Sequence, residues 1–453
     1  MKRYFRGGIH NSDGSDKLLS SQYPIKEYMP DSVEISMEQS GFGICKLLVN
    51  KGDLVTKGQI IGQPIFFSTA NIHASIDGIV SDIKIRKDSF SNEIPIVVID
   101  SNDQTITKEL EEEDKYKESI VNIEKFSKDE IITSMKNAGL VGMGGAGFPT
   151  HVKYETNKQV EYLLINGTEC EPYITCDHRL MLEHGYELIN GIRLLLKVSN
   201  AKRAFICIED NKIDAVENLK LILQERGLPI EVVVLPTKYP QGGERQLIQA
   251  VLEKEVPANG LPADVGVIVN NVSTVKALSD IIFNGKPLTS RIVTVSGNVK
   301  EPCNFRVPIG TRYSELIEQV GGYTIDNSRV LLGGPMTGES LQIAGKAKDL
   351  EGSVTKTSIG LLVLADYTLI ESPCIRCGEC ERICPAGLSP YKIDFAAINN
   401  DLSLCDKLYA TECISCGSCS YVCPAKRELA YRITVAKKEI YKQRKMKKGV
   451  VST

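Results

Sequence analysis

The sequence lacks a long apolar run. A helix that crosses a bilayer needs roughly 18 or more consecutive apolar residues, and no stretch of this 453-residue chain reaches that length. The first residues, MKRYFRGGIHNSDG, also lack the hydrophobic segment of a signal peptide. These absences predict a cytoplasmic protein without a transmembrane helix.

The chain also has little net charge. Its 54 Lys and Arg nearly balance its 57 Asp and Glu, which leaves a formal charge of −3. No overall field would therefore gather nucleic acid, and no nucleic-acid partner is expected. The composition, 42% hydrophobic and 25% charged, is typical of a globular protein. The length favours a multidomain chain, with about three or four domains.

Cysteine, by contrast, is abundant and unevenly placed. Nine of the 14 cysteines lie between Cys374 and Cys423. The reducing cytosol argues against a disulfide framework, so metal ligation is the expected use. Cys405 matches neither of the patterns described next and is expected to be a buried thiol. The dispersed cysteines are interpreted as small core residues, and they are Cys45, Cys170, Cys176, Cys207 and Cys303.

Two segments repeat the pattern C-x-x-C-x-x-C-x-x-x-C-P. This pattern is typical of bacterial ferredoxins with two [4Fe–4S] clusters, in which the fourth cysteine of each run binds the other cluster. The predicted ligands of one cluster are Cys374, Cys377, Cys380 and Cys423. Those of the other are Cys413, Cys416, Cys419 and Cys384. A pair of zinc sites is the alternative, but the third Cys-x-x-Cys step and the repeated Cys-Pro have no use there.

The periodicity of the remaining sequence predicts a multidomain α/β and α+β protein. Residues 1–110 alternate short β-rich pieces with glycine turns and indicate a barrel-sandwich domain like a lipoyl domain, without its lysine. Residues 111–290 alternate apolar strands with helices and predict a Rossmann-like parallel sheet. Residues 291–365 indicate a β-grasp-like domain. The cysteine module, 366–432, and a basic tail, 433–453, complete the chain.

Three features predict boundaries or local structure within these domains. The acidic stretch 109–117 is interpreted as a solvated linker. Ser127 and Glu130 have the spacing of a capping box, and Gly139 is placed to end the helix that follows. The tail contains seven basic residues and one acidic residue between Lys437 and Lys448. It is expected either to contact anionic lipid or an acidic partner, or to form a solvated terminus.

The densest glycine loop is Gly142-Met-Gly144-Gly145-Ala-Gly147. Glycines allow backbone amides to approach a phosphate, although a plain glycine turn remains the alternative. Because the loop follows a predicted helix rather than a strand, it does not match the Rossmann fingerprint. Polar loops follow three predicted strands, as a nucleotide site requires. They are NGTECEP from Asn166, YPQGGE from Tyr239, and Asn270-Asn271.

These segments resemble the flavin-binding motifs of the NADH-oxidising subunit of respiratory complex I. The Gly7-Gly8-Ile9-His10 start, the barrel-like segment and the paired cysteine runs resemble more closely RnfC, the iron–sulfur subunit of the Rnf ferredoxin:NAD oxidoreductase complex. The resemblance implies FMN, NAD(H), two [4Fe–4S] clusters, SLBB-like β-grasp structure and other Rnf subunits as partners. Ferredoxin would act indirectly, through the complex. It also implies a peripheral position on the cytoplasmic face of the membrane, with partner subunits translocating ions.

The resemblance also assigns site residues, none of them a side-chain acid or base catalyst. The FMN and nucleotide contacts that it implies are Gly142, Gly144, Gly145, Gly147, Lys153, Asn166, Thr168, Glu169, Gly242, Glu244, Asn270 and Asn271. Glu171 and Tyr239 would shape the nicotinamide side. Thr168 stands where complex I has aspartate, and Gly243 where it has glutamate. Two alternative functions are a cobalamin reductase-type flavoprotein and a cluster-only electron carrier.

Overall fold

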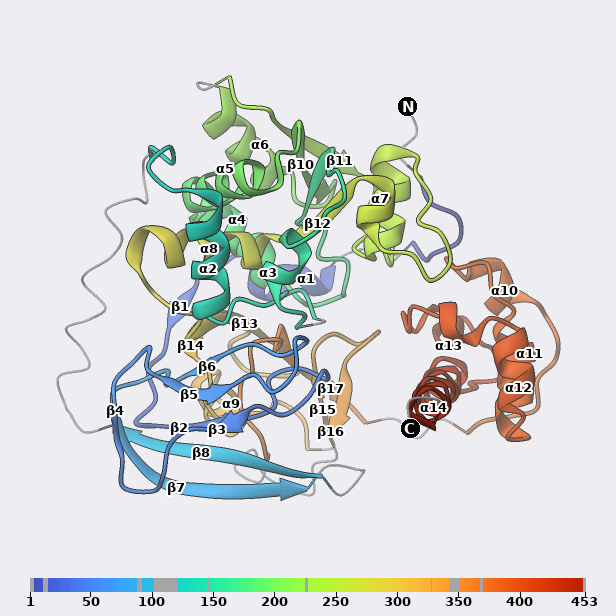
Figure 1. The fold of residues 1–453 in the computed structure, drawn as a ribbon. Coiled ribbons are helices and arrows are strands. Elements are labelled where there is room, and N and C mark those ends of the chain that lie inside the picture. Colours follow the sequence, from blue (N-terminus) through green and yellow to red (C-terminus); the bar gives the residue numbers. More distant parts are fainter. Residues whose placement is uncertain are drawn as a thin grey trace.

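The structure is a computed structural model, and it describes residues 4–10, 15–87, 92–101, 121–145, 147–224, 227–326, 328–341, 350–366 and 370–450. In Figure 1 the β-rich N-terminal part lies below the α/β part, and the cysteine-rich helices lie at the right. The predicted acidic linker, 109–117, lies outside the described residues.

The N-terminal part is a sandwich of two small antiparallel sheets. A short helix, α1 (Ser15–Ser21), and β1 (Lys26–Glu27) precede it. One sheet has the order β2-β8-β7-β4 and the other has the order β3-β5-β6. The strand bounds are β2 (Ser32–Ser36), β3 (Lys46–Leu47), β4 (Leu54–Val55), β5 (Ile60–Gln63), β6 (Ile72–His73), β7 (Gly78–Lys87) and β8 (Glu93–Ser101). Alternate residues such as Val33, Ile35, Val97 and Ile99 share one buried core, because successive strand residues point to opposite faces. The expected barrel-sandwich fold is confirmed.

The middle part is a parallel four-stranded sheet with the order β11-β10-β9-β12. Its strands are β9 (Tyr162–Asn166), β10 (Arg203–Glu209), β11 (Ile230–Leu235) and β12 (Val267–Asn271). The chain proceeds from β9 outward to β11 and then returns to the other side of β9. The strand order therefore reverses between β9 and β12, and ligands bind at such switch points in α/β sheets.

The first helix beside this sheet, α2 (Lys128–Asn137), begins with the predicted capping box. The Ser127 side chain accepts from the Glu130 amide, and the Glu130 side chain accepts from the Ser127 amide. The helix ends at Asn137 with Ala138 as its C-cap, and Gly139 follows with a positive φ of 65°. The helices are α2 (Lys128–Asn137), α3 (Thr150–Tyr154), α4 (Cys176–Glu183), α5 (Gly185–Ser199), α6 (Ile213–Gln224), α7 (Glu244–Leu252) and α8 (Val272–Asn284), with a 3₁₀ turn at Pro262–Val265.

The next part is a mixed sheet covered by α9 (Tyr313–Gln319), as a β-grasp fold requires. Its order is β1-β14-β13-β17-β15-β16, so the early strand β1 extends it beside β14. The other strands are β13 (Ser290–Gly297), β14 (Cys303–Pro308), β15 (Ser328–Leu332), β16 (Glu339–Leu341) and β17 (Gly360–Ala365). Leu316 and Ile317 of α9 are fully buried against this sheet.

The cysteine module is helical. It contains α10 (Glu379–Ile383), α11 (Pro390–Ile398), α12 (Leu402–Lys407), a 3₁₀ turn at Ala410–Glu412, α13 (Ser418–Tyr421) and α14 (Leu429–Val450). The residues from 433 onward, separated above as a basic tail, continue α14 without a break. Ile433, Ala436 and Ile440 are buried in the core that α14 shares with α11 and α12. At least this part of the tail is therefore packed rather than a solvated terminus.

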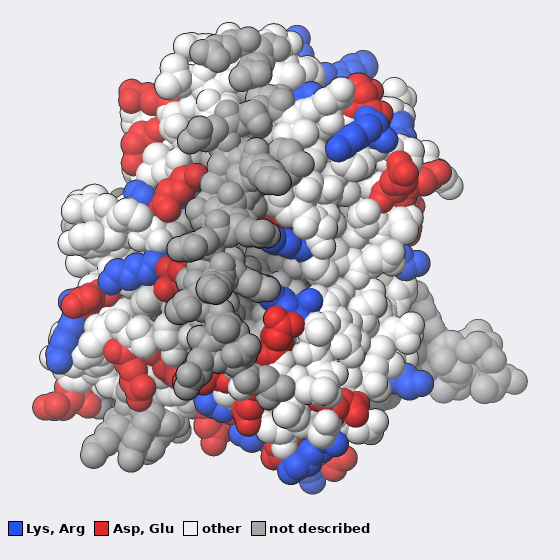
Figure 2. Space-filling view, turned by 90° about the vertical axis from the view of Figure 1, so that its left-hand side faces the viewer, with Lys and Arg blue, Asp and Glu red and all other residues white. Residues whose placement is uncertain are grey.

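Charge is dispersed over the face shown in Figure 2. Lysine and arginine alternate there with aspartate and glutamate, and the described residues of that face form no extended patch of one sign. This matches the small net charge of the chain. None of the helices in the described ranges combines the length and apolar character of a membrane span.

Candidate functional site

The structure gathers the cysteines of the two runs around two small pockets. One pocket is lined by Cys374, Cys377, Cys380 and Cys423. The other is lined by Cys384, Cys413, Cys416 and Cys419. In both pockets the fourth cysteine comes from the opposite run, which is the arrangement that the spacing predicts. Four sulfur donors converging on one small space form a donor set that suits an iron–sulfur cluster or zinc.

Backbone amides also point at these sulfurs. The amides of Arg376, Ser415 and Leu388 each donate to a cysteine Sγ two to four residues earlier, at 3.4 Å. Burial raises the pKa of the Cys384 and Cys413 thiols, so their thiolate forms require a compensating cation. Amide donors near sulfur are among the features that tune iron–sulfur potentials.

The two pockets differ in their surroundings. Cys374 and Cys377 are exposed, so the first pocket opens to solvent. The second adjoins the α/β part of the chain, where Ile9, Tyr239 and Ile383 form a small apolar core that Cys416 contacts. The Tyr239 hydroxyl donates to the Cys416 carbonyl at 2.6 Å. The second pocket is thus the one in contact with the loop that follows β11.

The glycine loop forms a tight hairpin before α3. The Gly142 amide donates to the Phe148 carbonyl at 2.8 Å, and the Gly147 amide donates back to the Gly142 carbonyl at 3.0 Å. Gly145 has a φ of 126°, which disfavours a side chain, and a Cβ placed there would meet nothing within 4 Å. Gly144 is also exposed and lies against Asn271. The loop therefore presents bare backbone to open space beside the end of β12.

Lys153 of α3 reaches toward the neighbouring strand and helix. Its ammonium donates to the Val269 carbonyl at 2.9 Å and lies 3.7 Å from the Glu244 carboxylate. Glu244 is the first residue of α7, where a carboxylate suits the helix dipole. The lysine and the glutamate are thus paired with each other near the glycine loop.

The loop after β9 holds Asn166 and Thr168 in a small network. The side-chain amide of Asn166 donates to the Gly242 carbonyl at 2.9 Å, and the Thr168 hydroxyl donates to the side-chain oxygen of Asn166 at 2.7 Å. A Cβ at Gly242 would lie 2.8 Å from the Thr168 hydroxyl, so only glycine fits there. These contacts join the loops that follow β9 and β11.

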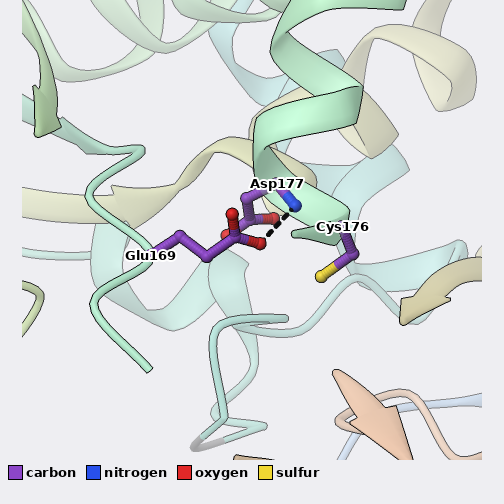
Figure 3. A group of neighbouring side chains, drawn as sticks. All are labelled: Glu169, Cys176 and Asp177. Carbon is purple, nitrogen blue, oxygen red and sulfur yellow. Dashed lines mark hydrogen bonds between the residues drawn. The ribbon is translucent and has the colours of Figure 1, made fainter. Parts of the chain in front are cut away.

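Glu169 and Asp177 meet at the start of α4, as Figure 3 shows. The Glu169 carboxylate accepts the amides of Asp177 and His178 at 2.7 and 3.1 Å. The Asp177 carboxylate in turn accepts hydrogen bonds from the side-chain amide of Asn271 and from the Ser273 hydroxyl, each at 2.6 Å. Burial raises the pKa of Glu169 to about 7. Cys176 lies close enough for a three-ligand metal site, but both carboxylates already have protein donors.

Two of the predicted contact residues, Glu171 and Asn270, are hydrogen-bonded to other parts of the protein. The Glu171 carboxylate accepts from the Met336 amide at 3.1 Å and from the Thr337 hydroxyl, in the turn between β15 and β16. The buried side-chain amide of Asn270 donates to the Tyr154 hydroxyl at 2.6 Å. These two residues tie neighbouring elements together, whereas Asn271 caps α8 at the Ser273 amide.

Two lysines, the half-buried Lys17 and the buried Lys212, support the loop after β9, and local sequence patterns identify neither of them. The Lys17 ammonium donates to the carbonyls of Glu169, Glu171 and Ile174 at 2.6 to 2.8 Å. The Lys212 ammonium donates to the Thr168 carbonyl at 2.8 Å. Lys17 arrives from α1, far away in the sequence, so only the fold could identify it.

Comparisons with known proteins follow the same division of the chain. The sequence model of the RnfC barrel sandwich hybrid domain matches residues 3–104, and that of the Nuo51 FMN-binding domain matches residues 135–280. The SLBB domain matches residues 292–340. These matches fall on the sandwich, the parallel sheet with its glycine loop, and the β-grasp-like sheet.

Proteins that align with most of this chain point to the same family as the domain matches. The chain is 39% identical over 400 residues to the C subunit of the proton-translocating ferredoxin:NAD(+) oxidoreductase complex of Clostridium ljungdahlii, covering 86% of this chain and 83% of that protein. It is 38% identical over 449 residues to the C subunit of the Na(+)-translocating ferredoxin:NAD(+) oxidoreductase complex of Acetobacterium woodii, covering 97% and 98%. An NAD+-reducing [NiFe]-hydrogenase structure in the H2-reduced state has a similar fold, with a TM-score of 0.50, 20% identity, and coverage of 68% of this chain and 63% of that chain.

Proposed function

The chain belongs to the RnfC family, the C subunits of the ion-translocating ferredoxin:NAD oxidoreductase complexes, and we propose from this that it carries electrons between NAD(H) and its partner subunits through FMN and two [4Fe–4S] clusters. The observation that carries the proposal is the contact of Tyr239 with Cys416. It joins a loop of the FMN-binding domain to a pocket lined by four cysteines.

The residues around the glycine loop fit FMN. Gly144 and Gly145 offer exposed backbone, with open space at Gly145 for a phosphate, and Lys153 of the following helix adds a cation. Asn166, Asn271 and Glu169 supply polar groups at the switch point between β9 and β12. We propose that these residues hold FMN, whereas Asn270 and Glu171 act through the elements that they tie together.

The cysteine pockets fit two clusters better than two zinc ions. Each pocket combines three cysteines of one run with the fourth of the other, as in two-cluster ferredoxins. When bound, FMN would exchange a hydride with NAD(H) and single electrons with the clusters, each of which takes one electron at a time. The protein holds the two sites next to each other, because Tyr239, Ile9 and Ile383 fix one cysteine pocket against the FMN-binding domain.

The two pockets have different proposed roles. The pocket of Cys384, Cys413, Cys416 and Cys419 serves the flavin side, because Tyr239 contacts it. The pocket with the exposed Cys374 and Cys377 serves partner subunits. We place the chain on the cytoplasmic face of the membrane as a peripheral subunit. Ferredoxin would reach it through other subunits, which would also carry out ion translocation.

Cofactor analysis of the full chain, prepared anaerobically, tests the proposal. We expect FMN, iron and acid-labile sulfide together, and NADH-dependent reduction of an artificial acceptor. Zinc in place of iron would refute the cluster assignment. An iron–sulfur spectrum without bound flavin, even after reconstitution with FMN, would indicate the cluster-only carrier instead.

A further inference from the structure

The first described residues of the chain lie between the FMN-binding domain and the cysteine module. Residues 4–10, which we call the N-terminal segment, pair with the loop after β11, where the backbones of Ile9 and Tyr239 exchange two hydrogen bonds of 2.7 Å. One residue earlier, the Gly8 amide donates to the Ile383 carbonyl of the cysteine module at 2.8 Å. The N-terminal segment is therefore hydrogen-bonded to both parts of the chain.

A buried lysine of the FMN-binding domain holds the start of this segment. The Lys238 ammonium donates to the Phe5 carbonyl at 2.8 Å and lies 4.1 Å and 4.2 Å from the ring centroids of Phe5 and Tyr4. Lys238 and Phe5 are both buried, and cation–π contacts are stronger where water is excluded. The N-terminal segment thus reaches the cysteine module from a fixed place on the FMN-binding domain.

Two glycines allow the segment to approach the backbone on both sides closely. Gly7 and Gly8 have φ values of 72° and 82°, a region that residues with a side chain disfavour. A Cβ at Gly8 would lie 2.6 Å from the Tyr239 carbonyl oxygen. A Cβ at Gly7 would lie 2.6 Å from the carbonyl oxygen of Ile383 and 2.8 Å from that of Cys384. Any side chain at Gly7 would therefore push directly against the backbone of Cys384.

Cys384 differs from the other cysteines of its pocket in where it comes from. Cys413, Cys416 and Cys419 belong to one run, whereas Cys384 belongs to the other run and follows the last residue of α10. The place of Cys384 therefore depends on how α10 packs. The last carbonyls of a helix lack partners within that helix, and the Gly8 amide supplies one for Ile383, at the end of α10.

We propose that Gly7 and Gly8 are positioning residues for Cys384, so that the N-terminal segment sets the place of the cluster beside the FMN-binding domain. The inference rests on the proposed function, because that cluster is part of it. The segment acts through the backbone of Ile383 and Cys384. A chain in which the segment is displaced should still bind FMN at the glycine loop but should lose the cluster of the second pocket.

The test uses the full chain, prepared anaerobically, with Gly7→Ala as the main variant. We expect this variant to lose about half of the iron, the share of one of two clusters, and to keep its FMN. Cys384→Ser should lose the same half, and the double variant should lose no more. The matched control is Gly322→Ala, because Gly322 has a φ of 82° but a Cβ there would meet nothing within 4 Å. Its iron content should equal that of the wild type.

Lys238→Met weakens the attachment of the segment without adding bulk, and it should lose iron from the same cluster in a smaller amount. Amide hydrogen exchange in α10 should rise in Gly7→Ala and in Lys238→Met, but not in Gly322→Ala. Full iron content with unchanged exchange in α10 would overturn the proposal. A double variant that lost nearly all of its iron, or loss of FMN along with the iron, would also overturn it. Zinc in place of iron in the wild type would refute the proposed function, whereas the exchange of α10 would still decide whether the segment holds this helix.

Discussion

The Tyr239 hydroxyl donates a 2.6 Å hydrogen bond to the backbone carbonyl of Cys416 and so connects the loop after β11 to a predicted cluster loop. Tyr239 is only 3% exposed, and burial raises the pKa of its phenol well above the usual range. The phenol therefore remains protonated and keeps donating throughout the physiological pH range. The contact makes the packing of the cysteine module on the FMN-binding domain specific rather than merely apolar.

Replacing Tyr239 with phenylalanine should weaken this packing by about 1 kcal/mol, the usual net contribution of one hydrogen bond. In rapid-mixing experiments, flavin reduction by NADH should keep its rate, whereas the subsequent bleaching of the clusters should slow. Tyr431→Phe, at a 67% exposed position of α14, is the control. Unchanged cluster bleaching in Tyr239→Phe would show that this contact does not govern the transfer.

Each pocket combines three cysteines of one run with the fourth cysteine of the other run, and this sharing makes a testable prediction. Cys423→Ser should remove about half of the iron, because it destroys the site that it shares with Cys374. Adding Cys374→Ser should then cost no further iron. If the two cysteines belonged to different clusters, the double variant would lose nearly all of it. Cys405→Ser, at a buried thiol that lines neither pocket, should leave the iron content unchanged.

Lys17→Met should loosen the loop after β9. It removes the ammonium from three backbone carbonyls in a partly buried environment, where the loss of charged hydrogen bonds is destabilising. We expect a loss of about 3 kcal/mol in the free energy of unfolding and a lower FMN content. Denaturant unfolding and flavin release on gel filtration measure the two effects. Lys51→Met, at an exposed position of the sandwich, should change neither. Full FMN retention in Lys17→Met would exclude a role in positioning this loop.

Lys356 should make the stability of the protein depend on pH. Its ammonium is buried and donates to the carbonyls of Asn71 and Gly139, and burial lowers its pKa from 10.5 to about 7. Between these two values the unfolded chain binds a proton that the folded chain has lost. The free energy of unfolding should therefore rise as the pH increases through this window, by at most about 1.4 kcal/mol per unit.

Urea unfolding between pH 7 and 10 measures this slope. Lys356→Met should be less stable, because the two carbonyls lose their donor, and its slope should be smaller than that of the wild type. Lys220→Met, at an exposed position of α6, should keep the wild-type slope. Equal slopes in the wild type and Lys356→Met would show that the lysine remains charged in the folded protein.

The sequence alone predicted the features that depend on neighbouring residues. The Ser127–Glu130 capping box requires only a spacing of three, and the structure contains it. The alternation of apolar strands with helices over residues 111–290 predicted a parallel sheet, and β9 and β10 of that segment are paired in parallel. The cysteine spacing likewise suggested which thiols would meet, because the repeated pattern has few ways to surround a cluster.

Only the tertiary structure decided the contacts between residues far apart in the chain. Lys17 lies about 150 residues before the loop that it supports, as its separation of 152 from Glu169 shows, and no local pattern marks it. Phe42 meets Phe148 only because the sandwich packs on the glycine loop. Sequence periodicity records which face of an element is buried, but the partner of that face is set by how whole domains pack, and this information is not local.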